Sequence, residues 1–170
     1  MKPIRPNIID IEASGFGVDS YPIEVGVALS NGQTYCALIK PDDAWQHWDL
    51  QAEQVHGLSL ELVCTHGKSI STVARELNAL LENKTVYSDG WVVDKPWMTE
   101  LFYRSGLEPN FFISSLEYIL KESQMEIWTE TQQQVIADLL LTRHRASTDA
   151  LIIQETYART QQVLADKIIR

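Results

Sequence analysis

The stretch Ile8-Ile-Asp-Ile-Glu12 places two carboxylates inside an apolar run that is typical of a buried β-strand. Because strand side chains alternate between faces, Ile8, Asp10 and Glu12 point one way and their apolar neighbours point the other. Two carboxylates about 5 Å apart repel by roughly 3 kcal/mol at an effective dielectric near 20, and partial burial adds to this cost. We therefore expect a divalent cation here. Mg²⁺ is the best candidate, because it binds one or two carboxylates and keeps positions open for phosphate oxygens.

The length and composition of the chain fit one globular domain. It has 170 residues, of which 45% are hydrophobic and 22% are charged, which is enough to bury a sizeable core. We therefore expect residues 1–170 to form a single domain. The first residues lack the apolar stretch of a secretory signal, and no run is long enough to cross a bilayer, so we expect a soluble cytoplasmic protein with no membrane partner.

The charge of the chain limits how it could bind nucleic acid. A formal net charge of −9 argues against a broad basic surface of the kind that coats a duplex. An enzyme that holds a few terminal nucleotides through metal ions stays compatible, because bound Mg²⁺ brings its own positive charge to an acidic site.

The spacing of apolar and turn residues predicts strands first and then an alternation of strands and helices. The expected strands cover residues 5–12, 21–30, 33–40, 85–88 and 111–114. The expected helices cover residues 69–83 and 95–105, and most of the remaining chain is helical. Asn31-Gly32, between the second and third strands, is a strong signal for a tight hairpin. This order predicts an α/β domain with a mixed sheet.

Two further acidic residues have structural explanations of their own. Asp94 precedes Pro96 and could cap the helix that follows, since Asp is a favoured N-cap and Pro is tolerated in a first turn. Asp149 follows Ser147 and Thr148, where a helix can begin, so it could simply complement the helix dipole. Taken alone, neither residue indicates a site.

The histidines differ in what surrounds them. His144 lies five residues before Asp149, an offset that does not share a helix face, so we expect it on the loop before the helix. The alternative is an ordinary exposed histidine beside Arg143 and Arg145, near the end of the preceding helix. His56 lies in a His-Gly-Leu stretch that is typical of a turn, which indicates a structural histidine.

Taken in order, these motifs resemble the DEDDh family of 3′-to-5′ exonucleases. The family has Asp-x-Glu on a first strand, Asp after the fourth strand, and His-x-Ala-x-x-Asp at the start of a late helix. The matching stretches are Asp10-Ile-Glu12 with Ser14-Gly15, Asp94 within Gly-Trp-Val-Val-Asp-Lys-Pro-Trp-Met, and His144-Arg-Ala-Ser-Thr-Asp149. Tyr-Pro-Ile-Glu-Val-Gly and Val-His-Gly-Leu-Ser resemble the family's second strand and the turn after its third.

The resemblance implies a ribonuclease-H-like fold, with a five-stranded mixed sheet flanked by helices. It also implies two Mg²⁺ or Mn²⁺ ions and release of nucleoside 5′-monophosphates from a free 3′ end. Asp10 would bridge both ions, Glu12 and Asp149 would hold the first, and Asp94 would reach the second. His144 would take the proton from the attacking water. Two metals can stabilise both the attacking and the leaving oxygens of an in-line displacement at phosphorus.

One motif departs from the family pattern. The family commonly has His-Asn ahead of the second-motif Asp and Phe just before it, where this chain has Asp89, Gly90 and Val93. Asp89 is therefore an alternative to Asp94 as a metal ligand. We favour Asp94, because its offset from the apolar pair at 97–98 matches that of the family.

Four residues are candidates for binding the 3′ nucleotide: Ser14, Gly15, Phe16 and Trp91. Ser14 and the nearby backbone are placed to contact the terminal nucleotide. Phe16 and Trp91 each have two interpretations, a core residue or a platform on which a base stacks.

The resemblance to ribonuclease T and oligoribonuclease slightly favours single-stranded or short RNA over DNA, and those relatives are often homodimers, which leaves a homodimer open. Two other functions remain as alternatives: a catalytically inactive protein that binds nucleic acid or a partner on the same fold, and an endonuclease of that fold. The four carboxylates argue against the inactive binder. The offset of His144 argues against the endonuclease.

Overall fold

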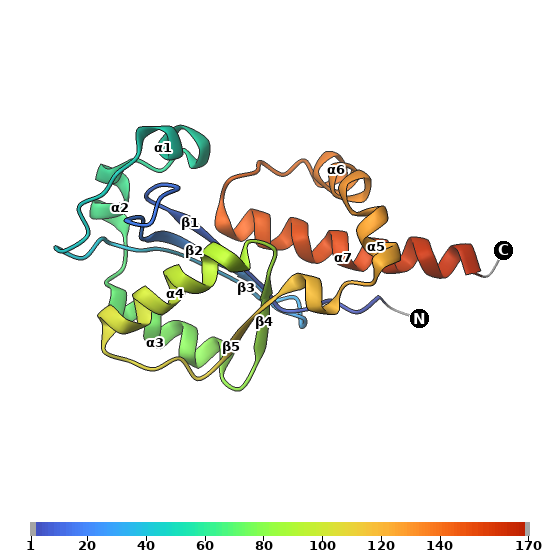
Figure 1. Cartoon of the computed structure of the whole chain (residues 1–170), viewed down its shortest axis with the longest axis horizontal. Coiled ribbons are helices and arrows are strands. Elements are labelled where there is room, and N and C mark those ends of the chain that lie inside the picture. Colours follow the sequence, from blue (N-terminus) through green and yellow to red (C-terminus); the bar gives the residue numbers. More distant parts are fainter. Residues whose placement is uncertain (1–2, 169–170) are drawn as a thin grey trace.

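The structure, a computed structural model, describes residues 3–168 and is built around a five-stranded sheet in the order β3-β2-β1-β4-β5 (Figure 1). The strands are β1 (Ile8–Ala13), β2 (Pro22–Ala28), β3 (Thr34–Leu38), β4 (Thr85–Ser88) and β5 (Phe112–Ser115). The helices are α1 (Leu50–His56), α2 (Leu60–His66), α3 (Ile70–Leu81), α4 (Trp91–Ser105), α5 (Glu122–Glu126), α6 (Trp128–Leu139) and α7 (Ala146–Ile168), with a 3₁₀ turn η1 (Leu116–Ile119). The mixed sheet is confirmed, since β1, β2 and β3 pair antiparallel whereas β4 and β5 run parallel to β1.

The pairing of the strands differs between the two halves of the sheet. β1 and β2 stay in register from Ile8 opposite Ala28 to Glu12 opposite Glu24. The register between β1 and β4, by contrast, consists of Ile8 opposite Tyr87. The antiparallel meander and the β4–β5 pair are therefore joined by a short seam.

The Asn31-Gly32 hairpin is present as predicted. Gly32 has a φ of 88°, in the left-handed region that glycine adopts readily. Its backbone N–H donates to the carbonyl of Leu29 at 3.0 Å, and the N–H of Leu29 donates to Gln33 at 2.8 Å. This turn fixes the register of β2 and β3.

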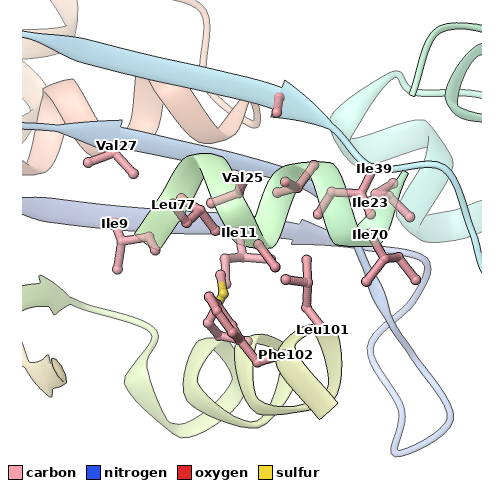
Figure 2. Packing of buried hydrophobic residues seen from close by; sticks show 14 of the residues in the cluster. Ile9, Ile11, Ile23, Val25, Val27, Ile39, Ile70, Leu77, Leu101 and Phe102 are labelled. Carbon is pink, nitrogen blue, oxygen red and sulfur yellow. The ribbon is translucent and has the colours of Figure 1, made fainter. Parts of the chain in front are cut away.

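The side chains of β1 alternate between two cores, as its sequence pattern predicts. Ile9 and Ile11 belong to the larger core, where β1 and β2 pack against α3 and α4 (Figure 2). Ile8 belongs to the smaller core on the opposite face, where it meets Ala150 and Ile153 of α7. Asp10 and Glu12 therefore lie on the face that α7 covers, with α5 and α6 packed against that helix (Figure 1).

A glycine on β2 allows α7 to begin close to the sheet. A Cβ at Gly26 would lie 2.1 Å from the backbone carbon of Ala146 and 2.1 Å from the backbone nitrogen of Ser147. No side chain fits in that space. Gly26 is also the cross-strand partner of Asp10, so the close approach brings the first turn of α7 to the carboxylates of β1.

The start of α4 differs from the prediction. The helix begins at Trp91 rather than at residue 95, with Gly90 as an N-cap that makes no side-chain hydrogen bond. The backbone N–H groups of Val93 and Asp94 donate to the Gly90 carbonyl, and Pro96 lies inside the helix at the loss of one backbone hydrogen bond. The proposal that Asp94 caps this helix is therefore wrong. Within the described part of the chain, no helix is both long and apolar enough to cross a bilayer.

Candidate active site

Three carboxylates meet where β1 passes the first turn of α7. Asp10, Glu12 and Asp149 each offer one oxygen, and these oxygens lie within 4.8 Å of one another. The alternation of β1 turns Asp10 and Glu12 toward α7. This helix starts at Ala146, just before the predicted start at Ser147 or Thr148. The fold thus brings together three of the carboxylates that the sequence singled out.

Burial and the charges of neighbouring carboxylates raise the pKa values of Asp10 and Glu12. Burial, followed by the charges of Asp94 and Glu12, holds the pKa of Asp10 well above its usual range. Burial, followed by the charge of Asp149, raises the pKa of Glu12 from 4.5 to about 7. A cluster that resists ionisation in this way is stabilised by any cation that enters it.

One oxygen of Asp149 accepts no hydrogen bond from any residue that the structure describes and is available to such a cation. The side chain is buried, and its Oδ2 accepts a hydrogen bond from the backbone N–H of His144 at 2.8 Å. Its Oδ1 has no hydrogen-bond partner among residues 3–168, and a buried acceptor without a donor is costly. Carboxylate oxygens are the ligands that Mg²⁺ and Mn²⁺ prefer. The residues present therefore fit a divalent cation.

Asp94 lies beside this group rather than within it. It is buried in the first turn of α4, where its Oδ2 accepts a hydrogen bond from the hydroxyl of Ser88. Burial raises the pKa of Asp94 to about 7, although the Ser88 hydrogen bond opposes the rise. After burial, Asp94 is the largest cause of the raised pKa of Asp10, and the exposed Asp89 is a smaller one. The charge of Asp94 thus acts on Asp10 more strongly than the charge of Asp89 does.

His144 lies on the loop directly before α7, as expected, and its side chain is exposed. Its φ of 68° is in the left-handed region, which residues other than glycine rarely adopt. The hydrogen bond from its backbone N–H to Asp149 holds this conformation. One carboxylate thus faces the cluster and also positions the histidine loop.

Glu24 on β2 also belongs to the site, although the sequence analysis did not single it out. It is fully buried and lies opposite Glu12 in the strand register. Its carboxylate accepts hydrogen bonds from Arg145, with Nη2 at 2.6 Å and Nε at 3.1 Å, and from the backbone N–H of Ala146 at 2.9 Å. These hydrogen bonds fix the start of α7 to β2, opposite Glu12 of β1. The signal was in the sequence: Glu24, like Asp10, is an acidic residue within an apolar strand.

A groove of about 560 Å³ opens between the segment after β1 and the first turns of α4. Phe16 is 67% exposed and Val92 is 78% exposed, and exposed apolar side chains that gather in one groove are typical of a binding surface. The lining includes Phe16, Val18, Trp45, Val92, Val93 and Trp97.

The other three residues predicted to bind substrate, Ser14, Gly15 and Trp91, make more contacts within the fold. Ser14 is buried, and both its hydroxyl and its backbone N–H bond to the backbone of Tyr21. Gly15 lies where a Cβ would come within 2.6 Å of the His47 side chain. Trp91 is half-buried, and its indole N–H donates to a carbonyl of β5. Phe16 is therefore the most open of the four.

Comparison with known proteins gives matches in structure but none in sequence. No family model matches the chain, and no curated protein does either. Solved structures of E. coli exonuclease I, however, match nearly the whole chain. The complex with a dA16 oligonucleotide gives a TM-score of 0.67 at 13% identity, covering 96% of this chain and 42% of that one.

Two further structures of that protein agree. Exonuclease I in its apo form gives a TM-score of 0.65 at 13% identity, covering 97% of this chain and 44% of that one. The zinc-bound complex with single-stranded DNA gives a TM-score of 0.66 at 12% identity, covering 98% of this chain and 42% of that one. The chain shares the fold of exonuclease I. The expected ribonuclease-H-like fold is thereby confirmed, in a chain that spans less than half the length of exonuclease I.

Proposed function

We propose that the chain is a metal-dependent exonuclease that shortens single-stranded nucleic acid from its 3′ end, with residues 1–170 as the exonuclease domain. The observation that carries this proposal is the group formed by Asp10, Glu12 and Asp149, whose oxygens lie within 4.8 Å of one another. It stands on a fold shared with exonuclease I. An inactive binding protein would have no use for such a mutually repelling group.

The residues divide the work between them. Asp10, Glu12 and Asp149 would hold one divalent ion, and Asp94 together with Asp10 would hold a second. Bound ions of this kind activate a water molecule and neutralise the charge that develops on the leaving oxygen. His144, exposed beside the cluster, accepts the proton of the attacking water.

The groove and the structural neighbours support a single-stranded substrate. Exonuclease I has been crystallised with dA16 and with dT13 oligonucleotides. This supports single-stranded DNA as a substrate of this chain, where the sequence slightly favoured RNA over DNA. Phe16, exposed at the edge of the groove, offers a ring on which a terminal base can stack. Stacking of this kind tolerates any base.

One gel tests the proposal. Labelled at the 5′ end, RNA and DNA single strands with free or phosphate-blocked 3′ ends are incubated with Mn²⁺ or Mg²⁺. Stepwise shortening of the free-ended strands alone is expected, and Asp10→Asn should abolish it, which excludes a contaminating nuclease. Internal cleavage of blocked strands would instead favour the endonuclease. Retention of intact strands with every metal would favour the inactive binder.

A further inference from the structure

Two arginines flank His144, and they are held very differently. Arg145 makes charge-assisted hydrogen bonds with the fully buried Glu24, at 2.6 and 3.1 Å. Arg143 makes a looser contact, with its Nε 3.6 Å from Oδ1 of Asp149 and its side chain 47% exposed. That distance is too long for a hydrogen bond. Arg145 is therefore fixed in the fold, whereas Arg143 is free to exchange its partner.

The contact of Arg143 falls on the carboxylate that a cation needs. Oδ1 of Asp149 is the buried oxygen that has no hydrogen-bond partner within residues 3–168. The guanidinium thus offsets part of the repulsion that Asp149 exerts on the neighbouring carboxylates.

We propose that Arg143 is an exchangeable counter-ion with two tasks. In the metal-free protein it neutralises Asp149. Once a divalent cation binds there, Arg143 turns to a phosphate of the substrate strand beside the scissile bond. Guanidinium suits both tasks, because it pairs with carboxylate and with phosphate in the same forked geometry. The first task is independent of the proposed exonuclease function, and the second rests on it.

The charge of the chain supports the second task. With a formal net charge of −9, the protein as a whole repels a polyanion, so cations at the site itself must hold the strand. Arg145 is committed to Glu24. Arg143, next to the exposed His144, has the reach and the exposure to contact an entering strand.

Calorimetric titration of Mn²⁺ without nucleic acid tests the counter-ion. Arg143→Gln removes the competing charge and should tighten the dissociation constant for Mn²⁺ about two- to fivefold, as expected for loss of a partly exposed ion pair. Arg143→Lys keeps the charge and should bind Mn²⁺ like the wild type. Arg104→Gln is the matched control, since it removes the same charge from an exposed pair with Glu100, about 15 Å along α4 from Asp94. Unchanged or weaker Mn²⁺ binding by Arg143→Gln, relative to this control, would overturn the first task.

Initial rates on oligo(dT) at saturating Mn²⁺ test the phosphate contact. Arg143→Gln should raise KM about three- to tenfold and leave kcat within about twofold, because the contact binds the strand without entering the chemistry. The slope of log KM against log salt should fall by about 0.7, the value for one phosphate contact on a single strand. Arg143→Lys should recover part of the lost affinity.

The two arms fail separately. An unchanged KM and salt slope in Arg143→Gln would overturn the phosphate contact. If the wild type cleaves no strand, the exonuclease proposal fails, while fluorescence anisotropy of the same labelled oligo(dT) still measures whether Arg143→Gln weakens strand binding. Equal anisotropy curves for wild type and variant would then count against Arg143.

Discussion

Replacing Glu12 by glutamine should stabilise the metal-free protein at alkaline pH far more than at acidic pH. In the folded protein the pKa of Glu12 is raised from 4.5 to about 7, first by burial and then by the charge of Asp149. The folded state therefore holds this proton more tightly than the unfolded chain does. The contribution of this proton to the free energy of unfolding is fully present below about pH 4.5 and is lost as the pH rises through about 7. The variant carries an amide that does not ionise, so it escapes this loss.

The size of the effect follows from the size of the pKa change. A rise of the pKa from 4.5 to about 7 lowers the unfolding free energy at pH 8 by roughly 3 kcal/mol relative to strongly acidic pH. At pH 5 the corresponding loss is roughly 1 kcal/mol. Glu12→Gln should therefore gain about 2 kcal/mol on the wild type between these two pH values. An imperfectly paired amide costs about 1 kcal/mol at both pH values and leaves the difference unchanged.

Urea unfolding in the presence of EDTA at pH 5 and pH 8 measures this gain. Glu108→Gln, which changes an exposed carboxylate on the loop before β5, serves as the control and should show no comparable pH-dependent gain. Adding Mn²⁺ at pH 8 should reverse the order of stability, because the wild type binds the ion more tightly than the variant. A Glu12→Gln protein that matches the wild type at both pH values, or exceeds it equally at both, would refute the reasoning.

Three further substitutions separate the roles within the site. His144→Ala should lower the rate about 10² to 10⁴-fold while Mn²⁺ affinity persists, and the remaining rate should rise with pH because hydroxide partly replaces the base. Asp149→Asn should lose Mn²⁺ affinity and activity together at every pH, since a charged ligand is missing. Gly26→Ala should lower the unfolding free energy by about 2 kcal/mol and remove the Mn²⁺-induced rise in Tm, because its Cβ would meet the backbone of Ala146 at 2.1 Å. Each role has a result that would contradict it. For His144→Ala this is near wild-type turnover, and for Asp149→Asn it is unchanged Mn²⁺ affinity. For Gly26→Ala it is a normal Mn²⁺-induced rise in Tm.

The sequence predicted the features that depend on neighbours along the chain. The alternation of β1 was enough to place Asp10 and Glu12 on one face, and Asn31-Gly32 was enough to predict the hairpin. The helix start at Trp91 was missed, because a proline usually marks the first turn whereas Pro96 is tolerated further along.

Features that depend on distant partners were out of reach. Glu24 could be noticed as a charge in an apolar strand, but its pairing with Arg145 joins segments that only the folded chain brings together. The same holds for Ser14, whose hydroxyl is used by the backbone of Tyr21, and for the close approach at Gly26. Periodicity specifies which face a residue occupies, and the tertiary fold decides what it meets there.

The short seam between β1 and β4 has a consequence for cooperativity. Since the strands are in register at Ile8 and Tyr87, few ladder hydrogen bonds hold the meander to the β4–β5 pair. The packing of α4 against β1, β2 and α3 adds to them. Asp10 lies on one side of this seam, and Asp94 follows β4 on the other. A cation shared by these two carboxylates would tie the halves into one unfolding unit, so amide exchange in β4 should slow more than that in the β2–β3 hairpin when Mn²⁺ is added.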